Sequence, residues 1–337
     1  MDLNTLWYIL IAVLFAGFFV LEGFDYGVGI LLPFVGKTDL DRRLVLNSIG
    51  PVWDANEVWM LTAGGAMFAA FPGWYASLFS GFYLALVLML VALIIRGVAF
   101  EFRSKHDHPR WRSLWDLAIF IGSFVPALLW GVVMGNLIRG VAVDANQDYV
   151  GGFWALLNPF ALLGGVASVL VFALHGALFL GLKTTGTLQE RVRGLYWRIW
   201  VPTAAVIFGV ILASYFVTDR LARLGVNPGY GPVLALGGIL AAGWAARAGR
   251  EGWGFLFTTV SIVFAVVTVA VALFPNVLFS SLNPEWSLTI YNTSSSPYTL
   301  KVMTIVALTM VPIVLAYLAW TYWVFRKRVS SETHLEY

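Results

Sequence analysis

Apolar runs of about 20 residues recur along the whole chain, and each is long enough to cross the roughly 30 Å hydrocarbon core of a bilayer as a helix. Of the 337 residues, 60% are hydrophobic and only 12% are charged, which is too little charge for the surface of a soluble protein of this length. The runs are continuous and do not alternate at every second residue, which argues against a transmembrane barrel. The sequence therefore predicts an all-α, polytopic membrane protein.

We expect a single transmembrane domain over residues 1–337, with about nine spanning helices packed in bundles. Their approximate bounds are 6–34, 52–71, 75–100, 114–138, 157–182, 200–218, 231–247, 254–274 and 301–325. The run 52–71 is the weakest, because charged residues lie near its start and a Pro-Gly pair follows it. No small-residue cleavage site follows the first run, so we interpret it as a retained helix. The longest connection, 275–300, fits either an ordered cap or a mobile loop.

Lysines and arginines gather in alternate loops, after the first, third, fifth, seventh and ninth runs. These residues are Lys37, Arg42, Arg43, Arg103, Lys105, Arg110, Arg112, Lys183, Arg191, Arg193, Arg198, Arg247, Arg250, Arg326, Lys327 and Arg328. Only Arg139, Arg220, Arg223 and Lys301 lie near the opposite ends. By the positive-inside rule, we expect the N-terminus outside and the C-terminus in the cytoplasm. The same pattern accounts for the net charge of +3 without a nucleic-acid partner.

Four carboxylates lie in glycine-rich, hydrophobic surroundings at the end of the first run and the start of the second. They are Glu22, Asp25, Asp54 and Glu57. Within each pair the residues are three apart and share one face of a helix. Counted from the cytoplasm inward, the order is Asp54, Glu57, Asp25, Glu22. Desolvated carboxylates can accept and release protons near neutral pH, so this order predicts a ladder for protons.

A structural explanation of the same carboxylates stays open. Asp54 would face the positive end of the second helix, and arginines would neutralise the rest of the group. The candidates for that pairing are Arg42, Arg43 and Arg96. Arg96 is the most interesting, because it lies inside an apolar run, near the inner membrane edge. Glu101 lies near the same edge and is a further candidate for the proton pathway.

Histidine and cysteine usage limits the cofactors that this chain can bind. The absence of cysteine excludes disulfides, thiolate-bound iron–sulfur clusters and thiolate-ligated haem. His175 alone among the four histidines lies inside an apolar run, where it could ligate haem, relay protons or be a hydrogen-bonded packing residue. A bis-histidine haem needs a second histidine at that depth, so we expect no haem in this chain. His106 and His108, beside Asp107, form a weak metal signal, and a solvated loop is the alternative.

Three segments of the sequence are similar to subunit II of cytochrome bd-type quinol oxidases. They are residues 21–29 (LEGFDYGVG), 50–59 (GPVWDANEVW) and 96–103 (RGVAFEFR), and Leu174–Ala177 and Lys183-Thr184 also fit. The similarity is densest over the first 105 residues, and the nine-span layout extends it along the chain. Ala55 departs from the family, which usually has glycine there, and we expect this to affect packing and not chemistry.

The resemblance implies a respiratory enzyme of the bacterial or archaeal cytoplasmic membrane that oxidises quinol and reduces oxygen to water. It implies that subunit I holds the three haems, of b and d type, and the quinol site, and that subunit II ligates none. Residues matching Asp25 and Asp54 would contribute to a cytoplasmic proton pathway toward the haem site. A small single-span subunit, quinone and lipids are the further partners that we expect.

Two other functions remain as alternatives. In a proton-coupled secondary transporter, the carboxylates would bind the coupling proton or cation, but no matching pair of broken helices is evident in the two halves. In a purely structural scaffold, the chain would only stabilise its haem-bearing partner, and neutralising Asp25 would leave turnover intact.

Overall fold

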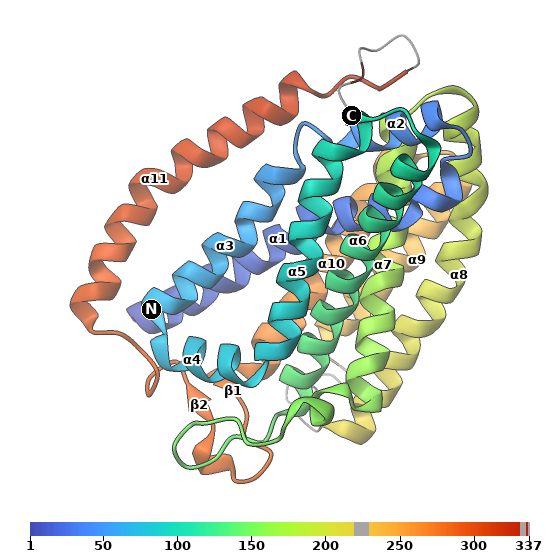
Figure 1. Ribbon diagram of the computed structural model, residues 1–337. Coiled ribbons are helices and arrows are strands. Elements are labelled where there is room, and N and C mark those ends of the chain that lie inside the picture. Colours follow the sequence, from blue (N-terminus) through green and yellow to red (C-terminus); the bar gives the residue numbers. More distant parts are fainter. Residues whose placement is uncertain (219–228, 331–334, 336–337) are drawn as a thin grey trace.

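The computed structural model describes residues 1–218, 229–330 and 335, and helices dominate it (Figure 1). The α-helices are α1 (Leu3–Val35), α2 (Asp39–Ile49), α3 (Trp53–Ala70), α4 (Pro72–Gly81), α5 (Tyr83–Phe102), α6 (Pro109–Arg139), α7 (Pro159–Lys183), α8 (Gly186–Val217), α9 (Tyr230–Arg247), α10 (Glu251–Leu273) and α11 (Pro297–Val324). Short 3-10 helices are η1 (Arg103–Lys105), η2 (Phe153–Leu157) and η4 (Pro284–Trp286), and strands β1 (Asn276–Leu278) and β2 (Leu288–Thr289) pair antiparallel.

Seven helices of the described chain are long and apolar enough to span a membrane, namely α1, α5 with η1, α6, α7, α8, α10 and α11. This confirms an all-helical, polytopic membrane fold. The remaining two expected spans correspond to α3 and α9, which have 18 residues each. The count of nine and the orientation of the termini therefore stay predictions, and Arg220 and Arg223 lie outside the described residues.

Two segments differ from the sequence expectation. The run 75–100 is two helices, because the chain turns at Phe82 between α4 and α5. Ser77 on α4 donates to the carbonyl of Gln147 at 2.6 Å, which ties this short helix to an outer loop. The charged stretch after α1 is the helix α2, which begins with a capping box between Thr38 and Asp41.

The centre of the bundle is the crossing of α1 and α7. A Cβ atom on Gly27 would overlap the backbone carbonyl of Phe172, and one on Gly176 would overlap the backbone of Gly27. The two helices therefore touch backbone to backbone, which only glycine permits at these positions. Helices α3, α6 and α10 also pack on α1, so residues near this crossing lie deep in the protein.

The connection 275–300 is an ordered cap at the N-terminal end of α1. It contains β1, η4 and β2, and its backbone joins the bundle where the Ser295 N–H donates to the carbonyl of Ala70 at 2.9 Å. Asn4 donates its side-chain amide to the carbonyl of Ile290 at 2.7 Å. The sequence left a cap or a mobile loop open, and the structure shows a cap.

Helix α11 stands apart from the bundle on one side (Figure 1). None of its most apolar 18-residue stretch is buried. It joins the rest of the chain at its two ends. Near its start, Trp7 donates to the carbonyl of Leu300 at 3.1 Å, and near its end, Tyr322 contacts α3.

Candidate functional site: a buried carboxylate cluster

Arg96 on α5 links two of the carboxylates. Its Nη1 donates to Oε1 of Glu22 on α1 and, at 3.2 Å, to Oε1 of Glu57 on α3. Arg96 and Glu22 are fully buried, whereas the Glu57 side chain is 21% exposed. The guanidinium also lies over the rings of Tyr26 and Phe100, at 5.0 and 5.6 Å from their centres. One arginine thus holds three helices together and neutralises Glu22.

Asp25 has a different environment, although it lies one turn from Glu22. Its Oδ2 accepts a hydrogen bond of 2.7 Å from the side-chain amide of Asn56, and the Tyr322 hydroxyl donates to Oδ1 of Asn56 at 2.7 Å. Asp25 and Asn56 are both fully buried. A polar chain therefore runs from α11 through α3 to α1. In the described part of the protein, no lysine or arginine lies within ion-pair distance of Asp25.

The sequence reasoning missed Asn56 and Tyr322. It searched the apolar runs for charged side chains and passed over neutral polar ones. An asparagine between two acidic residues on a spanning helix is itself a signal, because an amide in hydrocarbon needs hydrogen-bond partners.

The cluster contains more negative than positive groups. Glu22, Asp25 and Glu57 share one guanidinium, and several buried polar atoms have no hydrogen-bond partner among the described residues. These atoms are Glu22 Oε2, Asp25 Oδ1, Tyr26 Oη, and Arg96 Nε and Nη2. Three buried carboxylates cannot all stay ionised beside a single cation, so the cluster can hold protons and exchange them.

Two of the expected site residues lie outside this buried cluster. Asp54 is exposed in the first turn of α3, one turn before Glu57 and on the same face. Glu101 is exposed near the end of α5. Asp54 therefore lies between the helix end and the cluster, while Glu101 lies at the surface.

Arg42 and Arg103 pair with a different carboxylate. Both contact Asp116 on α6, Arg42 through Nη1 at 2.6 Å and Arg103 through Nε at 2.5 Å. Near these pairs, Asp41 on α2 accepts from Arg191 at 2.9 Å and from the backbone of Thr38. Burial alone would raise the pKa of Asp41, but the hydrogen bonds from Arg191 and Thr38 outweigh it and hold that pKa below its usual value. These ion pairs connect α2, α6 and α8, and not the cluster.

His175 on α7 is fully buried, and both ring nitrogens have partners. Nδ1 lies 2.7 Å from the Thr258 hydroxyl on α10, and Nε2 lies 3.0 Å from the carbonyl of Val20 on α1. Its ring also stacks on Phe255, with the centres 4.3 Å apart. Neither nitrogen is available to an iron atom, so this side chain does not fit a haem ligand and acts as a packing residue between three helices.

The loop histidines lie at the start of α6. Nδ1 of His108 accepts from the Arg110 backbone as the helix cap, and Asp107 pairs with Arg112 at 2.5 Å. In the parts of the chain that the structure describes, no group of three or more histidine or acidic side chains could hold a metal ion.

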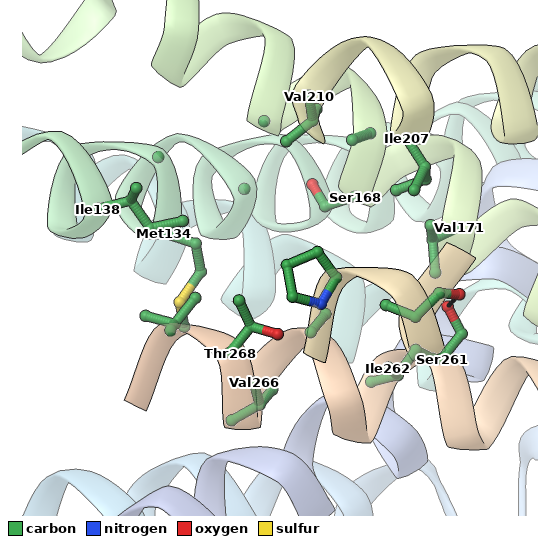
Figure 2. Close-up of a pocket in the computed structure, with 18 of the residues that line it drawn as sticks. Met134, Ile138, Ser168, Val171, Ile207, Val210, Ser261, Ile262, Val266 and Thr268 are labelled. Carbon is green, nitrogen blue, oxygen red and sulfur yellow. Dashed lines mark hydrogen bonds between the residues drawn. The ribbon is translucent and has the colours of Figure 1, made fainter. Parts of the chain in front are cut away.

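An apolar cavity of about 200 Å³ lies apart from these charged groups, among α6, α7, α8, α9 and α10. Figure 2 shows Met134, Val171, Ile207 and Val266 around it. Ser168, one of its hydroxyl residues, donates to the carbonyl of Ala127 at 2.5 Å, so its polarity is spent on the backbone. The cavity suits an apolar group and lacks the residues for acid–base chemistry.

The family model for cytochrome bd terminal oxidase subunit II matches residues 3–325. The chain belongs to this family. A relative named cytochrome bd ubiquinol oxidase subunit 2, from Bacillus subtilis (strain 168), is 43% identical over 336 residues, covering 100% of this chain and 99% of the relative. Cytochrome bd-I ubiquinol oxidase subunit 2 of Escherichia coli (strain K12) is 41% identical, covering 98% and 96%.

A solved structure, the bd oxidase from Geobacillus thermodenitrificans, has the same fold. It matches with a TM-score of 0.78 over 96% of this chain and 99% of that chain, at 18% sequence identity. As a subunit II, the chain is part of a haem-based quinol:oxygen oxidoreductase complex with a subunit I. It is a multi-pass protein of the bacterial cytoplasmic membrane. The resemblance of the motif segments to this family is thus confirmed.

Proposed function

We propose that this subunit supports the assembly of its haem-bearing partner, subunit I, and delivers cytoplasmic protons toward the oxygen-reducing site there. In this proposal the haems b and d reside in subunit I, where they supply the electrons that reduce oxygen. The arginine-rich end of the bundle faces the cytoplasm, as the positive-inside rule requires. The side chains of this chain then have to hold and move protons only.

One observation carries the proposal, and it is the contrast between Glu22 and Asp25. Glu22 has a buried arginine as its partner, as a structural ion pair does. Asp25 is equally buried, yet its hydrogen bond comes from the neutral amide of Asn56. A buried carboxylate without a paired cation is expensive unless it binds a proton. Asp25 therefore suits reversible protonation, and Glu22 with Arg96 suits a fixed role.

The proton path follows from the depth of each carboxylate. Asp54 is exposed and receives a proton near the cytoplasmic surface, and Glu57 lies one helical turn deeper with a partly exposed side chain. Asp25 lies in the buried centre, where Asn56 and Tyr322 orient its carboxyl group. Glu101, at the surface end of α5, adds negative charge near the intake. Each step moves a proton between carboxyl groups and leaves no new charge in the membrane.

The face that includes α3, α5 and α11 suits contact with subunit I. Large apolar side chains on these helices are exposed, for example Leu61 at 67%, Leu84 at 58% and Leu308 at 73%. The carboxylates on α3 lie beside this face, which places the proton path next to the partner. For the other partners, we propose that the apolar cavity accommodates a lipid or quinone chain and that a small single-span subunit completes the complex.

The test is the assembled oxidase with Asp25→Asn or Asp54→Asn, and Asp148→Asn, an exposed aspartate in an outer loop, as the matched control. We expect unchanged haem content, with oxygen consumption falling about tenfold or more for Asp25→Asn and less for Asp54→Asn. Oxygen consumption is measured with quinol, together with haem spectra. Normal turnover in fully assembled variants would contradict proton delivery, and loss of haem with normal turnover per haem would support a scaffold role instead.

A further inference from the structure

A second site lies on the other side of the bundle from α11, in a groove between α8 and α9 (Figure 1). The groove has a volume of about 570 Å³ and lies near the end of the bundle where the arginines gather. Arg193, Trp197 and Trp200 line it from α8, and Gly243 and Arg247 line it from α9. We propose that this groove binds the phosphate headgroup of an anionic phospholipid.

The tryptophans form a fixed wall. Trp200 donates its indole N–H to the carbonyl of Ile239 at 2.6 Å, and its ring lies so close to Gly243 that a Cβ atom there would overlap it. Trp197 stacks on Trp200 with ring centres 4.7 Å apart. Tryptophan side chains of this kind favour the headgroup level of a bilayer.

The two arginines provide the positive charge. Arg247 lies over the Trp197 ring at 5.3 Å, and within the described residues it forms no ion pair with a carboxylate. Arg193 donates through Nε to Glu251 at 2.5 Å, which fixes the side chain. Its hydrogen bonds within the described residues involve no terminal nitrogen, so these can donate to an oxyanion. Two guanidinium groups with one carboxylate leave a net positive groove, and guanidinium matches the geometry of phosphate.

The surroundings favour a lipid over a free phosphate ion. Helix α8 has only 11% of its spanning stretch buried, so it faces the hydrocarbon of the membrane. Beyond the groove, exposed apolar side chains continue along both helices, including Val201 and Phe208 on α8 and Leu240 on α9. A phosphate bound between the arginines would have its acyl chains beside these residues. Basic pockets between spanning helices on the cytoplasmic side bind anionic headgroups by this arrangement.

The experiment uses the purified two-subunit oxidase, stripped of lipid in mild detergent. Binding of phosphatidylglycerol is measured by native mass spectrometry, with phosphatidylcholine as the neutral comparison. Arg247→Gln is the main variant, because Arg247 is exposed and its loss should not affect folding. Arg326→Gln is the matched control, since Arg326 also lies over an indole, that of Trp323, at 4.3 Å, but on α11's side. Trp197→Leu is a second variant that removes the platform and keeps the charge.

We expect the wild type and Arg326→Gln to bind phosphatidylglycerol at one site in preference to phosphatidylcholine. Arg247→Gln should bind it about tenfold more weakly, and Trp197→Leu should also be weakened. Equal binding by wild type and Arg247→Gln would overturn the proposal. Displacement of the lipid by millimolar inorganic phosphate would also overturn it, because the groove would then be a site for the free ion.

Discussion

The substitution Arg96→Gln tests how the buried charges are balanced. Arg96 contacts Glu22 and Glu57, and it is fully buried together with Glu22. Glutamine keeps much of the volume and can donate one hydrogen bond, but it removes the only cation in contact with these carboxylates among the described residues. Glu22 would then need to take up a proton or lie unpaired in the protein interior.

The size of the effect follows from the burial. Removing one partner of a buried ion pair costs about 3–5 kcal/mol, because the remaining charge stays desolvated. Glu22→Gln should cost less, since Arg96 keeps Glu57 at 3.2 Å. In the double variant Arg96→Gln, Glu22→Gln both groups are neutral and can bond to one another. We therefore expect it to regain about 2 kcal/mol or more of what Arg96→Gln alone loses.

The assay is the loss of haem absorption and of the assembled complex during titration with a denaturing detergent. Arg326→Gln, a substitution of an exposed arginine, is the control and should shift stability by less than about 1 kcal/mol. If Arg96→Gln were as stable as the wild type, Arg96 would not be neutralising buried charge. If the double variant were less stable than Arg96→Gln, the pairing with Glu22 would not be the source of the effect.

Two further predictions concern residues outside the proton path. His175→Ala should leave the haem spectrum of the assembled oxidase qualitatively unchanged and lower its stability, because the ring packs and bonds between helices and ligates nothing; loss of one haem band with subunit I still folded would contradict this. Asp41→Asn should destabilise the complex at pH 7. Because the folded pKa of Asp41 is lowered, its contribution is present above its ordinary pKa of about 3.9 and is lost as pH falls through the folded value. The difference in stability between Asp41→Asn and wild type should therefore persist to pH 5 and shrink only below about pH 4, and a difference that already shrinks between pH 7 and pH 5 would refute it.

The membrane fold could be predicted because hydrophobicity over about 20 residues is a strong and local signal. The bend at Phe82 could not, since a window of apolar residues reads the same whether the helix is straight or broken. Helix α2 did have a local signal, the threonine at position 38 with Asp41 three residues later, which is a capping-box spacing. It was overlooked because its residues are mostly polar and do not span the membrane.

The site was predicted in part. Depth and spacing identified Glu22, Asp25 and Glu57, but the choice between Arg42, Arg43 and Arg96 as partners depends on how helices are arranged in three dimensions. The structure pairs Arg96 with two of the carboxylates. The contrast between a charge-paired Glu22 and an amide-bound Asp25 was equally inaccessible, because the two residues look alike in the sequence.

The attachment of α11 has a consequence for the order in which the chain is made. Asn56, which orients Asp25, has its own partner in Tyr322, 266 residues later. A ribosome that adds roughly 5–20 residues per second needs more than about ten seconds to cover this interval. During this time the early helices are inserted while the amide of Asn56 lacks its tyrosine. The polar chain through α1, α3 and α11 is thus completed by the last helix to be synthesised.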